Sequence, residues 1–167
     1  MNGDGGSDAR VVRAMLPGRV IECFVAVETI AGADVRIGAC VLGYDRGNRV
    51  LDVRRTLLVR NTGGRVELAV LRVALWSRRL WAPAEHLVVH LAGEYVTRRV
   101  EAGLDELRRF PKIGSASIEV EGARLEFTCG FEADRTDRPT TPRMEEAVAL
   151  AKSGRVGVEL DCEAPLA

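Results

Sequence analysis

Glu67 is the residue whose type and position most directly suggest chemistry, because it is a lone carboxylate near the start of a long apolar segment. It follows the sequence Asn61-Thr62-Gly63-Gly64-Arg65-Val66, which is typical of the beginning of a helix. Carboxylate oxygens are the ligands that hard divalent cations such as Mg²⁺ prefer, and bound metal ions can activate water for hydrolysis. Glu67 therefore belongs either to an acidic metal-binding site or to what remains of one.

The segment that positions Glu67 is expected to be a buried helix. Apolar residues occupy most positions from 65 to 81, and so apolar a helix packs between other elements rather than on a surface. Thr62 is the expected N-cap, because its hydroxyl can accept a hydrogen bond from an amide of the first turn. Pro83 lies just beyond the expected end, where proline commonly follows a helix.

Strands are expected on both sides of this helix. Apolar runs rich in β-branched residues predict buried strands, and Asp45-Arg46-Gly47-Asn48 is a strong turn signal. The predicted strands cover residues 20–30, 34–44, 48–59, 86–91, 118–120 and 124–129. Short helices are expected at 94–100 and 104–110, a polar loop at 134–142, an amphipathic helix at 144–152, and a last short strand and tail within 155–167.

Length and composition predict one globular domain. The chain has 167 residues, 47% hydrophobic and 29% charged, with zero formal net charge, which favours neither disorder nor a membrane protein. No apolar run approaches the roughly 20 residues needed to cross a bilayer. We expect a flexible N-terminal tail at 1–18, a folded domain at 19–153 and a C-terminal extension at 154–167.

The cysteines and histidines are expected to be structural. Cys23, Cys40, Cys129 and Cys162 are scattered without a C-x-x-C pair, so buried thiols in the cytoplasm or another reducing intracellular compartment are favoured over disulfides. His90 should share a strand face with Val88 and Ala92. We expect it to be buried and hydrogen-bonded to a neighbour.

The predicted order β-β-β-α-β-α-β-α, together with the sequence N-T-G-G-R-V-E-L, resembles the ribonuclease H family. Members carry T-N-N-R-x-E-L at this point, so Thr62, Arg65, Glu67 and Leu68 match while two asparagines become glycines. The segments Ile37–Val41 and Glu94–Val96 are similar to two further family motifs. The resemblance spans roughly residues 20–152 and implies an α/β fold, in which a mixed sheet of three antiparallel strands followed by βαβ-type strands is flanked by helices.

The resemblance also implies four carboxylates that bind two divalent metal ions. The first falls at Ala26, the second at Glu67, the third at Ala92, and the fourth at Met144 or Glu145 depending on a one-residue shift. A methyl group cannot bind a metal, so the match predicts a degenerate family member. Glu28 and Glu94 lie two residues beyond the two alanines, on the same strand face if the strands continue. A relocated site of Glu28, Glu67, Glu94 and Glu145 therefore stays open as an alternative.

Arginines beside aromatic residues supply candidate binding surfaces. Trp76, Arg78, Arg79 and Trp81 combine groups that stack on bases and hold phosphates, but the same groups anchor protein interfaces and tryptophans of a buried helix are often core. Arg98 and Arg99 lie where relatives carry basic residues that hold the hybrid substrate. Because acidic residues are interspersed nearby, an ion-paired solvent face is the simpler interpretation.

These observations lead to three hypotheses. The first is a pseudoenzyme, a non-catalytic ribonuclease H-like domain that serves as a scaffold in a protein or ribonucleoprotein complex, with no cofactor and with a protein partner or a second copy of itself. The second is a nuclease that cuts RNA/DNA hybrids with Mg²⁺ at the relocated glutamates. The third is nucleic-acid binding without cleavage. No membrane partner is expected.

Overall fold

In the computed structural model of the chain, the described residues are 18–29, 34–91, 96, 98–100, 102, 124–128 and 142–163. Residues 1–17 of the expected tail at 1–18, the strand at 118–120 and residues 134–141 of the expected loop at 134–142 lie outside these ranges, as do Ala92, Glu94 and Cys129. Pro142 is the first residue of a helix. Of the two expected short helices, residues 96, 98–100 and 102 are helical. The second, at 104–110, also lies outside the described residues.

Three long antiparallel strands form the centre of the structure. They are β1 (Arg19–Thr29), β2 (Val35–Asp45) and β3 (Asn48–Arg60). A two-residue turn joins β2 to β3, and its residues Arg46 (φ 51°) and Gly47 (φ 87°) both have positive φ angles. This backbone geometry matches the twist of a tight hairpin, so the predicted turn is confirmed.

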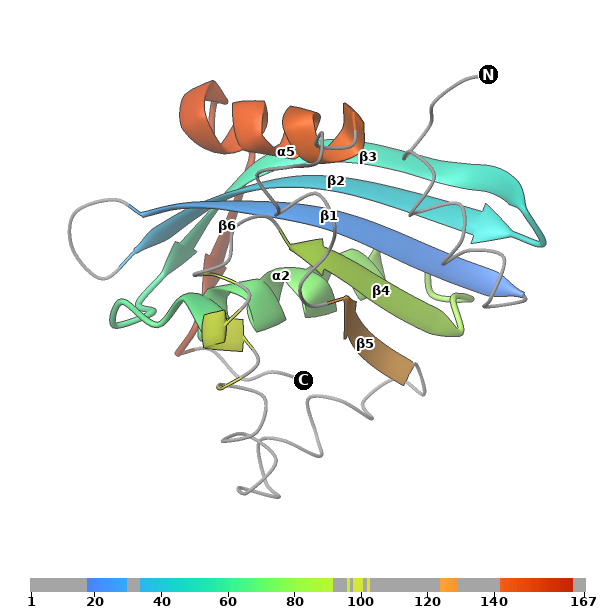
Figure 1. Ribbon diagram of the computed structural model, residues 1–167, viewed down its shortest axis with the longest axis horizontal. Helices are drawn as coiled ribbons and strands as arrows, with labels where there is room; N and C mark the ends of the chain where they lie inside the picture. The colour runs from blue at the N-terminus through green and yellow to red at the C-terminus, as the bar shows by residue number, and fades with distance from the viewer. Residues whose placement is uncertain are drawn as a thin grey trace.

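Three shorter strands complete a six-stranded mixed sheet in the order β5-β4-β1-β2-β3-β6 (Figure 1). β4 (His86–Leu91) is parallel to β1, β5 (Arg124–Thr128) is parallel to β4, and β6 (Val158–Asp161) is parallel to β3. The first five strands form the mixed sheet expected of a ribonuclease H-like fold, and this fold is confirmed. β6 comes from the predicted C-terminal extension and adds an edge strand beside β3.

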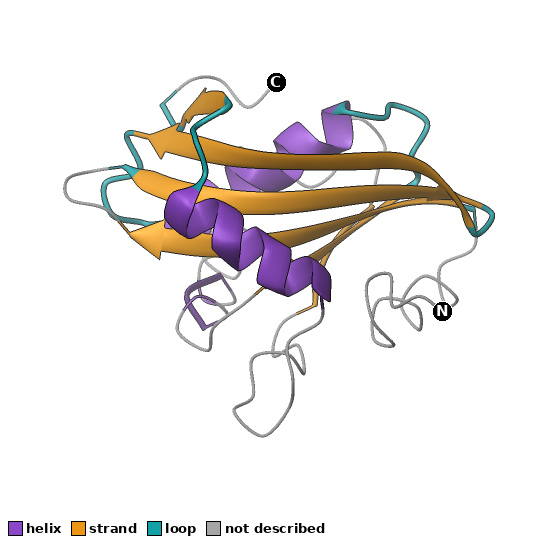
Figure 2. Cartoon of the chain, turned by 90° about the horizontal axis from the view of Figure 1, so that it is seen from above, coloured by secondary structure: helices purple, strands orange, loops and turns teal. Residues whose placement is uncertain are grey.

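Two described helices cover opposite faces of the sheet (Figures 1 and 2). α2 (Val66–Arg79) packs on a core that includes Ile21, Cys23 and Val25 of β1. α5 (Pro142–Ser153) packs on a second core that includes Phe24 and Ala26 of the same strand. Because successive side chains of a strand point to opposite faces, β1 is apolar nearly throughout. No helix within the described ranges combines the length and apolar character needed to span a bilayer.

The start of α2 differs from the prediction, because Thr62 does not cap it. The Thr62 hydroxyl accepts a hydrogen bond from the Gly64 amide at 3.2 Å, and the helix begins only at Val66. Gly63 (φ 63°) and Gly64 (φ 79°) form a left-handed turn that separates Thr62 from the start of α2. Glycine adopts this conformation at no steric cost, which suits it to both positions.

α5 lies unusually close to the sheet and is fixed there by polar contacts from β2 and β3. Arg36 Nε donates a 2.6 Å hydrogen bond to the Ala151 carbonyl, and the Thr56 hydroxyl donates a 2.8 Å bond to the Leu150 carbonyl. The Ala151 carbonyl lies in the last turn, where carbonyl groups lack helical partners, whereas the Leu150 carbonyl also accepts a bond from the Gly154 amide at 3.0 Å. At the other end, Arg54 pairs with Glu146 at 2.9 Å.

The described cysteines are free thiols. Cys23 and Cys40 are buried, and Cys162 is partly buried. Desolvation by burial raises the pKa of both the Cys23 and the Cys40 thiols to about 12, so neither is a reactive thiolate near neutral pH. For the three cysteines that the structure describes, the prediction of free thiols is confirmed, with Cys162 less buried than the other two.

Candidate functional site

The candidate site is made up of β1, β4, α2 and α5, the elements that carry the expected ligand positions. The two strands are parallel, and Val25 is aligned with Leu91 in their register. The next residues along the chain, Ala26 and Ala92, are the two positions at which the family resemblance implies metal-binding aspartates. Ala26 is among the described residues, and Ala92 is not.

Ala26 and Met144 belong to one buried apolar cluster. Ala26 is 3% exposed and Met144 is fully buried, and they pack together with Phe24, Cys40 and Ala147. The side chain at the first expected ligand position, and that of Met144 as one of the two candidates for the fourth, thus form part of the core beneath α5. Apolar carbon atoms cannot coordinate Mg²⁺, and a close-packed cluster leaves little room for a hydrated ion.

Met144 and Glu145, the two candidates for the fourth ligand position, have different environments at the start of α5. Met144 points into the sheet, whereas Glu145 is exposed. Successive residues of a helix are rotated by about 100°, so the two side chains cannot share a direction. The inward position is occupied by the methionine.

Glu67 is 7% exposed and lies between two guanidinium groups. Arg65 Nε donates to Glu67 Oε2 at 3.0 Å, and Arg99 Nη2 donates to Glu67 Oε1 at 3.4 Å. A buried carboxylate is costly unless it is paired, and both of its oxygens have a cationic partner here. Its position in the first turn of α2 also favours negative charge. In this arrangement, arginines supply the compensating charge that metal ions would supply in a nuclease.

The described glutamates do not converge on a metal site. Within the described ranges, no group of three or more histidine, cysteine, aspartate or glutamate side chains is placed to hold a metal ion. Glu28, which is half-buried, lies opposite Arg36 of β2. The relocated site therefore cannot be assembled from Glu28, Glu67 and Glu145 alone, and its fourth member, Glu94, lies outside the described residues. The described side chains do not fit a two-metal centre.

The candidate binding residues are distributed over different environments. Trp76 and Trp81 are half-buried and pack against the core on the α2 side of the sheet. Arg78 is 7% exposed, which leaves little of its side chain for a ligand, whereas Arg79 and Arg98 are exposed. The structure therefore does not present the predicted tryptophan and arginine residues as one continuous surface.

Glu22 and His90 form a buried polar pair that the sequence indicated only in part. His90 Nε2 lies 3.1 Å from Glu22 Oε2, both side chains are fully buried, and the imidazole stacks on Phe24 with ring centroids 4.5 Å apart. The expectation that His90 is buried and hydrogen-bonded is confirmed. Its partner was missed, although a glutamate inside the apolar run of β1 was the available signal.

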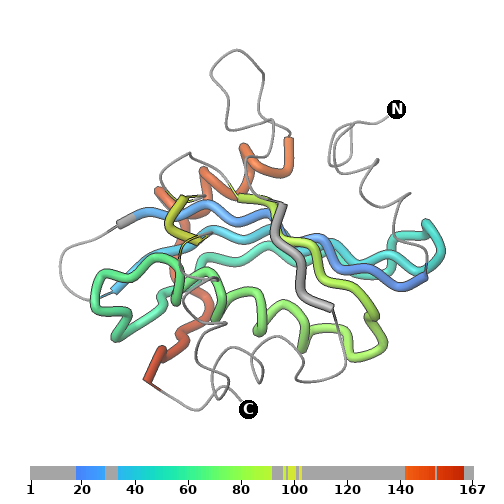
Figure 3. The backbone as a smooth tube through the Cα atoms, turned by 60° about the horizontal axis from the view of Figure 1, so that its bottom comes forward, coloured from blue at the N-terminus to red at the C-terminus, as the bar shows by residue number. Residues whose placement is uncertain are grey.

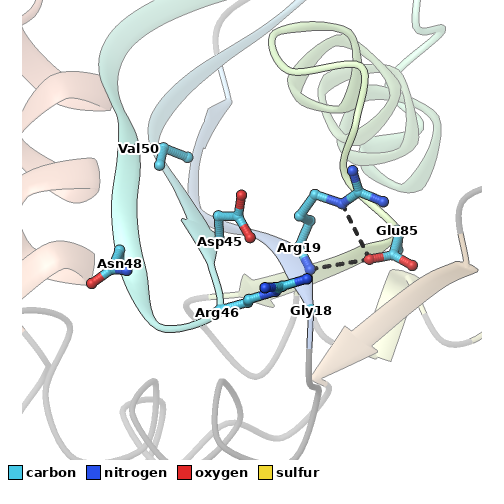
Figure 4. Close-up of a pocket in the computed structure, with 7 residues that line it drawn as sticks. All are labelled: Gly18, Arg19, Asp45, Arg46, Asn48, Val50 and Glu85. Atoms are coloured by element: carbon cyan, nitrogen blue, oxygen red, sulfur yellow. Dashed lines mark hydrogen bonds and ion pairs between the residues drawn. The ribbon is translucent and has the colours of Figure 1, made fainter.

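A cavity lies at the other end of the sheet, beside the hairpin of β2 and β3 (Figure 4). It measures about 690 Å³, and its lining includes Arg19, Arg46, Asp45 and Glu85. Glu85 accepts hydrogen bonds from the Arg19 backbone amide and side chain, and these bonds lower the pKa of its carboxyl group. The Arg19–Glu85 pair is accordingly an exposed ion pair.

Among known proteins, the chain is similar only to proteins found by comparison with solved structures. No protein-family model matches the sequence, and no curated protein matches it. Ribonuclease H1 from the archaeon Halobacterium salinarum is similar over 81% of this chain and 96% of its own, with 16% identity and a TM-score of 0.48. A prototype foamy virus protease-reverse transcriptase is similar over 81% of this chain and 20% of its own, with 14% identity and a TM-score of 0.45. A foamy viral protease-reverse transcriptase in complex with double-stranded DNA is 9% identical, with a TM-score of 0.44 and coverage of 81% of this chain and 95% of its own.

Proposed function

We propose that this chain is a non-catalytic ribonuclease H-like domain that serves as a binding or assembly module in a protein or ribonucleoprotein complex. The proposal rests on one observation, namely that the residues at the expected ligand positions are packed in the core or paired with arginine. Ala26 and Met144 are packed into the core, and Glu67 is neutralised by Arg65 and Arg99. A site of this composition lacks the clustered negative charge that holds two divalent ions. The proposed module requires no metal.

Removing the carboxylates also has a structural benefit that supports a scaffold role. Neighbouring carboxylates repel one another when no metal ion is bound. Ala26 and Met144 bury apolar surface in place of that repulsion. Burial of apolar surface stabilises the folded state by roughly 25 cal/mol per Å². The domain would then be stable without a ligand, as an assembly module must be.

The proposal is tested with an end-labelled RNA/DNA hybrid incubated with the pure full-length chain in Mg²⁺ or Mn²⁺. We expect no cleavage above the background of a buffer control, and no difference between the wild type and Glu67→Gln. Metal-dependent cleavage that Glu67→Gln abolishes would refute the proposal and would support the relocated glutamate site, with Mg²⁺ as its cofactor.

Nucleic-acid binding without cleavage is a second candidate function, favoured by the arginines around Glu67. The side chains of Arg65 and Arg99 are 40% and 43% exposed, and Arg98 beside them is also exposed. Parts of three guanidinium groups are therefore accessible near the start of α2. Guanidinium groups bind phosphate oxygens in a bidentate manner, which suits a nucleic-acid backbone.

This second function predicts hybrid binding that weakens steeply with added salt. Binding would be measured by fluorescence anisotropy between about 50 and 200 mM salt, where each lost phosphate contact lowers the slope of log K against log salt by about one. Arg99→Gln should lower both affinity and slope, while it keeps an amide that can donate to Glu67. Arg155→Gln, at an exposed arginine just before β6, is the matched control. Equal losses in the two variants, or no binding at low salt, would contradict this function.

A further inference from the structure

The edge strand β6 combines an apolar row with an open side. Val158 and Leu160 are half-buried and pack against the core on the α2 side. Val156, two residues earlier, is 38% exposed and is one of two large hydrophobic residues exposed in the described part of the chain. Among the described strands, β3 is the neighbour of β6, so the other side of β6 is a sheet edge.

A cavity of about 220 Å³ lies between this edge strand and α2, which are side by side in Figure 3. Its walls are Arg72, Leu75, Trp76 and Arg79 of α2 and Glu159, Leu160 and Asp161 of β6. Leu75, Trp76 and Leu160 make the cavity partly apolar. A half-buried tryptophan flanked by arginine is a typical anchor point of protein interfaces.

The backbone of β6 has hydrogen-bonding groups directed away from the sheet. The Cys162 amide donates to the Arg60 carbonyl at 2.9 Å, and Arg60 is paired with Asp161 in the register of β3 with β6. In a parallel ladder every second residue bonds to the same neighbour, so the backbone groups of Val158 and Leu160 face β3, whereas the amides and carbonyls of Glu159 and Asp161 face outward. Such an edge is a template for an additional strand.

We propose that β6 accepts an extended segment of a partner protein as an additional strand, in which apolar residues alternate with basic residues. This inference rests on the proposed function as a binding module and names the surface and the kind of partner. The apolar residues would lie on the α2 side, over Trp76 and Leu160. The basic residues would lie on the opposite face, beside Glu159 and Asp161.

Charge decides between such a partner and a second copy of this chain. Glu159 has a side chain that is 60% exposed, and its ion pair with Arg60 is long at 3.7 Å. If β6 of two copies paired about a two-fold axis, Glu159 of one copy would lie opposite Glu159 or Asp161 of the other. Like charges directly opposite each other destabilise a strand pair. A segment with basic residues at these positions removes the repulsion and adds an attraction.

The test uses a peptide of about eight residues in which lysine and valine alternate, titrated into the isotope-labelled full-length chain and followed by NMR. We expect saturable shifts that centre on the Glu159 and Asp161 amides and the Trp76 indole. Glu159→Lys should weaken binding about fivefold or more, and Trp76→Ala should also weaken it. A peptide of alternating glutamate and valine should bind the wild type less tightly.

Glu145→Lys provides the matched control, because it makes the same charge change at an exposed residue of α5. Equal weakening by Glu145→Lys and Glu159→Lys, shifts centred away from β6, or no saturable binding would each overturn the inference. The outcome is independent of the cleavage assay. Cleavage of a hybrid would refute the proposed function and leave the titration unchanged, whereas a failed titration would leave the absence of cleavage intact.

Discussion

Gly38→Ala is expected to destabilise the protein by about 3 kcal/mol, with loss of the tight packing of α5 on β2. A Cβ atom at residue 38 would overlap the Ala147 carbonyl oxygen and would lie 2.5 Å from the Ala151 amide nitrogen. Both are backbone atoms of α5, so no side-chain rotation can relieve the overlap. The helix would have to move away from the sheet and weaken the contacts that Arg36 and Thr56 make with its end.

Urea denaturation at constant temperature measures this effect. Alanine restricts the unfolded chain and would on its own stabilise the protein by about 0.4–1 kcal/mol, so a measured loss underestimates the steric cost. Gly157→Ala is the matched control, because the nearest atom to its Cβ would be Arg55 Cδ at 3.5 Å, an ordinary contact. Similar free energies of unfolding for Gly38→Ala and the wild type would contradict the close packing of α5 described above.

Breaking the buried pair of Glu22 and His90 is expected to cost about 3–5 kcal/mol when one partner is removed. Both side chains are fully buried, so His90→Phe leaves a carboxylate in the core without its histidine, and Glu22→Leu leaves an imidazole without its carboxylate. An unsatisfied buried polar group bears its full desolvation penalty. The phenylalanine of His90→Phe retains the stacking on Phe24, which separates the loss of the hydrogen bond from the loss of packing.

A double-mutant cycle tests this pair. Glu22→Leu with His90→Phe removes both polar groups of the pair, so the double variant should be more stable than the sum of the single changes predicts. The measured quantity is the free energy of unfolding of the four proteins. If the two single changes were additive, Glu22 and His90 would not interact, and the 3.1 Å contact would have no energetic role.

The sequence predicted elements whose signals are local. Continuous apolar runs identified the central strands, and the turn signal at Arg46 and Gly47 identified their hairpin. The N-cap was predicted incorrectly because a left-handed turn at Gly63 and Gly64 separates Thr62 from the first helical residue. The local pattern for a helix start does not report how many residues such a turn occupies.

The features that decide the candidate site depend on contacts between distant segments. The partner of Glu22 is set by the parallel register of β1 with β4, and the Arg99–Glu67 pair joins residues 32 positions apart. The rotation of α5 decides that Met144 rather than Glu145 points inward. None of these contacts leaves a periodic signal in the sequence. The resemblance could identify which positions to compare, but only the packing of the side chains indicates what replaced the carboxylates.

The most direct test of the central claim is a titration of the pure chain with Mn²⁺, in which free ion is measured by electron paramagnetic resonance. We expect no saturable binding up to millimolar Mn²⁺, and the same curve for the wild type and Glu67→Gln, because Ala26 and Met144 are core residues and arginines neutralise Glu67. Saturable binding of a metal pair by the wild type, lost in Glu67→Gln, would contradict the claim that the metal centre has been dismantled.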